Sequence, residues 1–281
     1  MSLDLPDIGF GTSGAKGHDC ADATRTALDA GYRFVDTAQM YDNEPAVGAG
    51  LRLSDVDSEG RSPSGSRTQS GDREDVVLAS KILPDNLGYE DAKRTSYESL
   101  DRLGVDAVDL LYVHWPTGAY DPEESLRALQ ELHDEGVARN VGVSNFTPEL
   151  LDEAREILDA DIAAHQVECH PLFPQDELRA YAAEHGHTVV GYCPLGQGEI
   201  FDTPEIQEVA ERHDTTAAAV CIAWAVEKEA LVPIPQSTDP EHIRANVEAT
   251  ELDLTEEDVA TIDGIDEERR LIDPDGAAWN Q

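Results

Sequence analysis

The strongest constraint on the fold is a strict alternation between short apolar runs and longer amphipathic segments. Runs of β-prone residues occur at 8–12, 34–36, 76–81, 108–115, 140–144, 164–168, 188–192 and 231–234. Between them, apolar residues recur at the spacing of a helix, for example Leu126, Leu129 and Leu132. This alternation predicts parallel strands joined by crossover helices, because a tight hairpin cannot connect parallel neighbours.

The punctuation of the helical segments agrees with this pattern. Pro240 follows Asp239 at an expected helix start, Thr255 precedes Asp258 by three residues as in a capping box, and Gly136 ends another helix. Eight strand–helix units in 281 residues fit a single-domain α/β protein with a closed (β/α)₈ TIM barrel. A doubly wound sheet would usually have fewer units.

The N-terminal region also contains a pattern typical of another fold. Gly9, Gly11 and Gly14 form a G-x-G-x-x-G pattern, and Asp36 follows 22 residues after Gly14. This is the fingerprint of a dinucleotide-binding βαβ unit. The first glycine is preceded by almost no apolar strand, and the eight units do not fit a Rossmann domain, so the barrel is favoured.

The charge composition excludes several classes of partner. The chain carries 59 Asp and Glu against 20 Lys and Arg, a formal net charge of −39, and only four of its cations are lysines. Nucleic acid and anionic membranes need a positive surface and are not expected as partners. Acidic residues spread over a folded chain indicate a halophilic protein of a salt-rich cytoplasm, where ions screen self-repulsion.

Several segments bound the domain organisation. Residues 54–75 are rich in Ser, Gly and Asp and predict a flexible insertion, and residues 266–281 form a short C-terminal tail. No run approaches the roughly 20 apolar residues of a membrane span, the first residues do not resemble a signal peptide, and we expect a cytoplasmic monomer. The scattered cysteines, Cys20, Cys169, Cys193 and Cys221, predict reduced core residues rather than disulfides or a zinc site.

Polar side chains gather at the ends of the predicted strands. In such barrels the active site lies at the carboxyl ends of the strands. Taken singly, each of these residues is more simply a loop cap or a packed core residue, but together they converge on one mouth. The set comprises Asp36 with Tyr41, Lys81, His114, Ser144 with Asn145, Gln166 with Glu168, Tyr192 and Ser237.

Lys81 needs a partner, because an unpaired ammonium at the end of a buried strand would cost several kcal/mol. Asp36 is the obvious one. A nearby ammonium should lower the pKa of Tyr41 and so make it a better acid, and His114 could orient a carbonyl. No His-x-His strand end or carboxylate cluster predicts a metal site. A Schiff-base lyase using Lys81 remains an alternative, but carbonyl reduction also explains the Ser-Asn-Gln set.

The ordered motifs of the chain resemble those of the aldo-keto reductases, in particular prokaryotic diketogluconate-reductase-like members. The resemblance implies a nicotinamide cofactor, NAD(P)H, bound by a barrel without a Rossmann domain. It covers nearly the whole chain. The matching stretches are residues 9–12, 36–41, 43–44, 80–81, 109–116, 142–146, 166–168, 170–171, 194–196 and 234–235 with 237.

The resemblance also implies roles at the matching positions. Tyr41 would be the general acid, Asp36 and Lys81 would tune it, and His114 would orient the substrate carbonyl. A second group would hold the cofactor, with Ser144, Asn145 and Gln166 at the nicotinamide carboxamide and Tyr192 stacked on its ring. Further cofactor contacts would come from Leu195, Gly196, Ser237, Thr238 and Asn246.

The chain departs from the family pattern where the 2′-phosphate of NADPH would bind. Gln236 replaces a usual lysine, His242 replaces a usual arginine, and Asp239 adds a negative charge to the same loop. These changes favour NADH, or loose use of both cofactors, although Arg244 could compensate.

Trp115 and Trp279 are the candidates for the walls of the substrate pocket. The alternative is that both side chains only pack against the rest of the protein. The short tail predicts an open site for small-molecule carbonyl substrates. A cofactor-binding barrel that senses redox state with little turnover is the alternative from another functional class.

Overall fold

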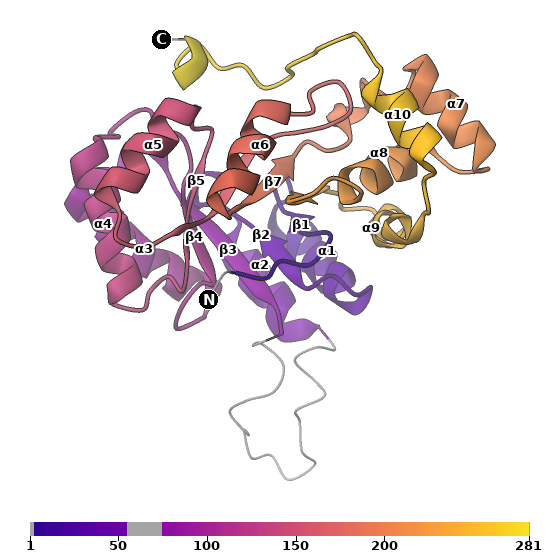
Figure 1. Ribbon diagram of the computed structural model, residues 1–281. Helices are drawn as coiled ribbons and strands as arrows, with labels where there is room; N and C mark the ends of the chain where they lie inside the picture. The colour runs from indigo at the N-terminus through magenta and orange to yellow at the C-terminus, as the bar shows by residue number, and fades with distance from the viewer. Residues whose placement is uncertain (1–2, 55–74, 281) are drawn as a thin grey trace.

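Eight parallel strands form one sheet whose spatial order equals their order in the chain. The computed structural model describes residues 3–54 and 75–280, so residues 55–74 of the expected 54–75 insertion lie outside the described residues. The predicted (β/α)₈ fold is confirmed (Figure 1). The strands are β1 (Phe10–Gly11), β2 (Phe34–Asp36), β3 (Val77–Ile82), β4 (Leu110–Val113), β5 (Val141–Ser144), β6 (Ile162–Glu168), β7 (Thr188–Tyr192) and β8 (Leu231–Pro233).

Backbone hydrogen bonds join the last strand to the first. The Gly9 N–H donates to the Pro233 carbonyl at 2.9 Å, and the Gly11 N–H donates to the Pro235 carbonyl at 3.0 Å. A Cβ atom on Gly11 would lie 2.7 Å from the Ile234 carbonyl oxygen, so this junction requires a glycine.

Helices surround the barrel and connect its strands (Figure 1). Two helices begin at the cap residues that the sequence predicts. Asp239 accepts from the Glu241 N–H, and Thr255 with Asp258 forms a capping box. The helices are α1 (Gly17–Asp29), α2 (Glu44–Leu53), α3 (Tyr89–Leu103), α4 (Pro122–Asp134), α5 (Pro148–Ile157), α6 (Asp176–His185), α7 (Pro204–Arg212), α8 (Ala217–Val226), α9 (Pro240–Glu248) and α10 (Glu256–Asp263). No helix among the described residues has the length and apolar character needed to cross a membrane.

The alternation of side chains along the strands decides what reaches the mouth of the barrel. Successive residues of a strand face opposite sides, so residues two apart face the same side. One buried cluster contains Phe34, Ala79, Leu110, Tyr112, Ala164 and Val190. Each of five polar residues comes two positions after a member of this cluster, within the strand or just past its end. They are Asp36, Lys81, His114, Gln166 and Tyr192. The strand period therefore brings these polar side chains to one end of the barrel, above an apolar interior.

Candidate active site

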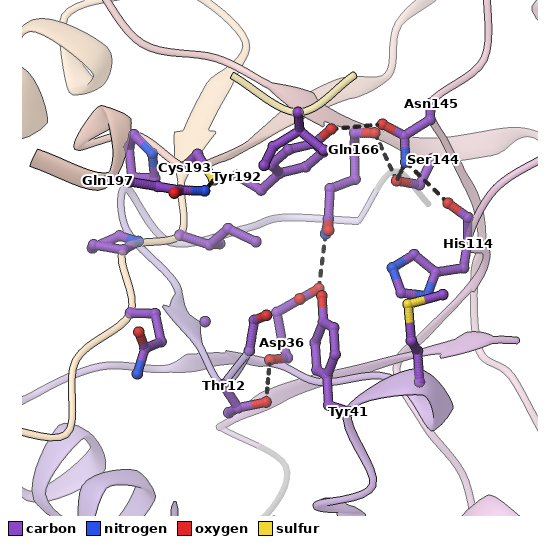
Figure 2. A pocket seen from close by; sticks show the side chains of 18 of the residues that line it. Thr12, Asp36, Tyr41, His114, Ser144, Asn145, Gln166, Tyr192, Cys193 and Gln197 are labelled. Carbon is purple, nitrogen blue, oxygen red and sulfur yellow. Dashed lines mark hydrogen bonds between the residues drawn. The ribbon is translucent and has the colours of Figure 1, made fainter. Parts of the chain in front are cut away.

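A cavity of about 470 Å³ opens at this end of the barrel (Figure 2). Most of the residues that the sequence singled out contribute to its wall. Lys81 lies beneath it and reaches the site through its hydrogen bonds. The predicted residues that line the cavity are Asp36, Tyr41, His114, Trp115, Ser144, Asn145, Gln166, Tyr192 and Leu195.

Asp36, Lys81 and Tyr41 form a connected group at the base of the cavity. Asp36 ends β2, Lys81 comes from the neighbouring β3, and Tyr41 closes the short 3₁₀ turn η1 (Gln39–Tyr41). Lys81 is fully buried, and its Nζ donates to Asp36 Oδ1, to the Thr37 carbonyl at 3.0 Å and to Tyr41 Oη at 3.5 Å. The ammonium is thus held between a carboxylate and a phenol.

The pKa values of Lys81 and Tyr41 are set by burial and by the charges that these residues and Asp36 place on one another. Burial would lower the pKa of Lys81, but the Asp36 carboxylate raises it, and the result is a raised pKa. Burial raises the pKa of Tyr41, Lys81 lowers it and Asp36 raises it, with a net increase. The expected net lowering of the Tyr41 pKa is therefore wrong, because burial, the largest cause, and the Asp36 carboxylate together outweigh the Lys81 charge. Tyr41 is protonated at neutral pH.

His114 lies at the edge of the Tyr41 ring. The two ring centroids are 5.7 Å apart, with an interplanar angle of 86°. Burial, and then the positive charge of Lys81, hold the pKa of His114 well below its usual range. The imidazole is therefore neutral at neutral pH, and it has one N–H to donate.

The side chains expected at the carboxamide form a hydrogen-bond network across the mouth, as Figure 2 shows. Asn145 Nδ2 donates to the His114 carbonyl at 3.1 Å and to Ser144 Oγ at 2.9 Å, and Tyr192 Oη donates to Asn145 Oδ1 at 2.9 Å. Gln166 Nε2 donates to Asp36 Oδ2 at 2.8 Å. The network therefore links the candidate cofactor side of the cavity to the candidate catalytic side.

Asn145 has a left-handed backbone conformation, with φ of 63°. The N–H of the next residue, Phe146, donates to His165 Nε2 at 3.3 Å. His165 lies on β6, between residues that face the barrel interior, so its side chain faces outward. Burial lowers the pKa of His165 to about 3, so its nitrogen stays free to accept this bond at neutral pH. A buried neutral histidine thus supports the conformation that aims the Asn145 side chain.

The remaining predicted residues lie outside the cavity wall. Gly196, Ser237, Thr238 and Asn246 are not among the described residues that line it. Ser237 Oγ accepts from the Asp239 N–H at 3.0 Å, and Asn246 is buried on α9. Trp279 is also outside the wall, but its ring centroid lies 5.7 Å from that of Trp115.

The structure adds cavity residues that sequence reasoning did not assign to the site, among them Thr12, Ser13, Met40, Cys193 and Ile272. Thr12 and Ser13 follow the first strand, so the rule about strand ends could have found them. Thr12 Oγ donates to the Asp36 carbonyl at 3.0 Å. Ile272 comes from the tail after α10, where no periodicity or motif marks it.

The cavity fits a nicotinamide cofactor. A carboxamide needs hydrogen-bond donors and acceptors, which the amides of Asn145 and Gln166 and the Ser144 hydroxyl provide. A planar ring needs an apolar or aromatic face, which Tyr192 provides. The space is of the size that small-molecule sites have.

Comparison with known proteins places the chain in a family. A sequence model of the Aldo/keto reductase family matches residues 7–267. An aldo-keto reductase of Mycolicibacterium vanbaalenii is 35% identical over 95% of this chain and 90% of its own length, and methylglyoxal reductase DkgB of Escherichia coli is 35% identical over 98% of both chains. The aldose reductase structure from Giardia lamblia superposes with a TM-score of 0.87 at 29% identity, covering 96% of each chain. The chain belongs to the aldo/keto reductase family and is an NAD(P)H-dependent oxidoreductase.

Proposed function

We propose that this reductase converts the carbonyl group of small aldehydes and ketones to an alcohol, with Tyr41 as the proton donor. The observation that carries this proposal is the convergence of Asp36, Tyr41, Lys81 and His114 at one cavity. The bound cofactor supplies the hydride. The relative from Escherichia coli is named a methylglyoxal reductase, and methylglyoxal is therefore a suitable first substrate.

Each side chain has a distinct task in this mechanism. The neutral His114 imidazole donates a hydrogen bond to the substrate oxygen and orients the carbonyl. Tyr41 is protonated and gives its proton to the same oxygen as negative charge develops there. Lys81 stabilises the resulting phenolate, and Asp36 keeps the ammonium charged and fixed in place.

Two alternatives fit these residues less well. A Schiff-base lyase needs a neutral, accessible amine, whereas Lys81 is fully buried, has a raised pKa and donates to three oxygen atoms. A redox sensor with little turnover would not need the complete catalytic set. The test is oxidation of NADH or NADPH with methylglyoxal and an aldehyde panel in molar KCl, with identification of the alcohol. Cofactor binding without turnover would support the sensor, and borohydride trapping of substrate on Lys81 would support the lyase.

NADH preference is the finer proposal for the cofactor. Asp239 caps α9 by accepting from the Glu241 N–H at 2.8 Å and from the His242 N–H at 3.4 Å. Its carboxylate therefore occupies donors that an anionic phosphate could otherwise use. Arg244 Nη1 donates to the Pro240 carbonyl at 3.1 Å, within its own helix. Gln236, which lines the cavity, carries no charge.

We therefore expect kcat/KM to be higher with NADH than with NADPH. The double variant Q236K/D239S restores a cation and removes the competing carboxylate, so the ratio of NADPH to NADH efficiency should rise by about tenfold or more. Glu248→Gln, which removes a carboxylate at the opposite end of the same helix, is the matched control and should leave the ratio unchanged. A wild-type kcat/KM for NADPH more than tenfold above that for NADH would contradict the proposal.

We also propose that the protein works as a monomer in a salt-rich cytoplasm. With 59 acidic against 20 basic side chains, self-repulsion destabilises the folded state most at low ionic strength. The Debye length falls from about 10 Å at 0.1 M salt to about 3 Å at 1 M. Thermal unfolding followed by circular dichroism should therefore give a Tm several degrees higher in molar KCl than in 0.1 M KCl. A Tm that stays constant or falls over this range would oppose the halophilic assignment.

A further inference from the structure

Glu168 is a buried carboxylate at the mouth of the barrel that the proposed mechanism does not use. It is the last residue of β6, two residues beyond Gln166, so it faces the same side of the sheet. Its side chain has no exposed surface. A carboxylate in such a place is costly unless all its oxygen atoms are satisfied, which raises the question of what it holds.

The partners of Glu168 come from the C-terminal tail. Oε1 accepts from the Leu271 N–H at 2.7 Å, and Oε2 accepts from the Ile272 N–H at 2.9 Å. His170 Nε2 lies 3.0 Å from Oε1. Both carboxylate oxygens therefore hold consecutive backbone amides of a segment that follows α10 and runs back across the barrel past α6 (Figure 1).

The attached segment contributes Ile272 to the wall of the cavity. Ile272, whose N–H is bound, lines the same cavity as Tyr41, His114 and Trp115. The Arg270 guanidinium lies 4.4 Å from the Phe173 ring centroid and 3.8 Å from that of Trp279. The Trp279 ring in turn lies beside Trp115. Two backbone hydrogen bonds to Glu168 thus fix the place where Ile272 of the tail meets the cavity.

We propose that Glu168 is a specificity-determining positioning residue, which fastens residues 271–272 so that Ile272 closes the substrate side of the cavity. This inference rests on the proposed reductase function. It explains a preference among carbonyl substrates that Tyr41 and His114, which contact only the carbonyl group, would not produce. The binding of substrates large enough to contact Ile272 depends on the hydrogen bonds that hold residues 271–272 to Glu168. A substrate that ends short of the wall needs only Tyr41 and His114.

The decisive comparison uses methylglyoxal and phenylglyoxal, which present the same dicarbonyl group and differ only in methyl against phenyl. In a Glu168→Gln variant the single amide oxygen can accept one of the two N–H groups, and the amide NH₂ opposes the other. We expect kcat/KM for phenylglyoxal to fall about tenfold through KM, with kcat within about twofold. The values for methylglyoxal and the Kd of the cofactor should change by less than about twofold.

A matched control separates positioning from general stability. Asp109 is also a buried carboxylate and accepts from the Leu78 N–H at 2.8 Å and from Arg139 at 2.5 Å, but it precedes β4 at the other end of the barrel. Asp109→Asn should lower Tm without changing the preference between the two substrates. Acrylamide quenching of Trp fluorescence should increase in Glu168→Gln, because Trp279 is released, and should not increase in Asp109→Asn.

Ile272→Ala provides a second route if Glu168→Gln does not fold. It should reproduce the loss with phenylglyoxal, and the double variant should lose little more than Glu168→Gln alone, because both changes remove the same wall. Equal losses with both substrates, or an unchanged preference in Ile272→Ala, would overturn the proposal. No turnover of either substrate by the wild type would contradict the proposed function, and with it any role in substrate selection.

Discussion

A Tyr41→Phe variant is expected to lose about 10²–10⁴-fold in kcat for carbonyl reduction, the usual contribution of a positioned general acid. The substitution removes one oxygen atom and leaves the ring beside His114 in place. Because the cofactor is assigned to other side chains, its Kd should change by less than about threefold. Steady-state kinetics with methylglyoxal, together with cofactor titration of the variant, measure both quantities.

The control for this experiment is Tyr97→Phe, which removes the same atom from an exposed tyrosine whose hydroxyl donates to Glu135. Its kcat should equal that of the wild type.

The pH profile of turnover adds an independent check. The pKa of Tyr41 is raised by burial, so the wild type should keep its proton donor through neutral and moderately alkaline pH. Unchanged turnover in Tyr41→Phe would refute Tyr41 as the acid.

The barrel could be predicted because the alternation of strand and helix is visible in the pattern of apolar residues along the chain. Alternating apolar runs and amphipathic helices occur eight times, and helix caps such as Thr255 with Asp258 mark the boundaries. The approach of Lys81 to Asp36 could be inferred from energy alone, since a lysine that ends a buried strand needs a carboxylate. Both inferences depend on local patterns and on the cost of burial.

Other features depend on tertiary distances that no local pattern encodes. The direction in which the pKa of Tyr41 changes follows from the balance among burial, Lys81 and Asp36, and the burial that dominates this balance arises only in the tertiary structure. The bond from Gln166 to Asp36 joins residues 130 positions apart. Glu168 was visible as a residue at a strand end, but its partners in the tail were not, because the chain after α10 has no periodicity.

Lys81→Met is expected to lower the free energy of unfolding by about 3–5 kcal/mol, because it leaves the Asp36 carboxylate buried without its ammonium. Asp36→Asn should have a similar cost for the opposite reason. Urea unfolding in molar KCl measures both. Lys93→Met is the control, because Lys93 pairs with Glu131 and Glu135 near the surface, and the loss there should be much smaller.

The double variant Asp36→Asn/Lys81→Met separates stability from catalysis. It removes both charges, so no unpaired ion remains in the core, and its unfolding free energy should recover most of what either single variant loses. Turnover should not recover, because the phenolate of Tyr41 would still lack the ammonium that now lies 3.5 Å from its oxygen. If activity returned together with stability, the pair would serve the fold alone. If neither returned, a contact other than the ion pair, such as the bond from Lys81 to the Thr37 carbonyl, would carry the stability.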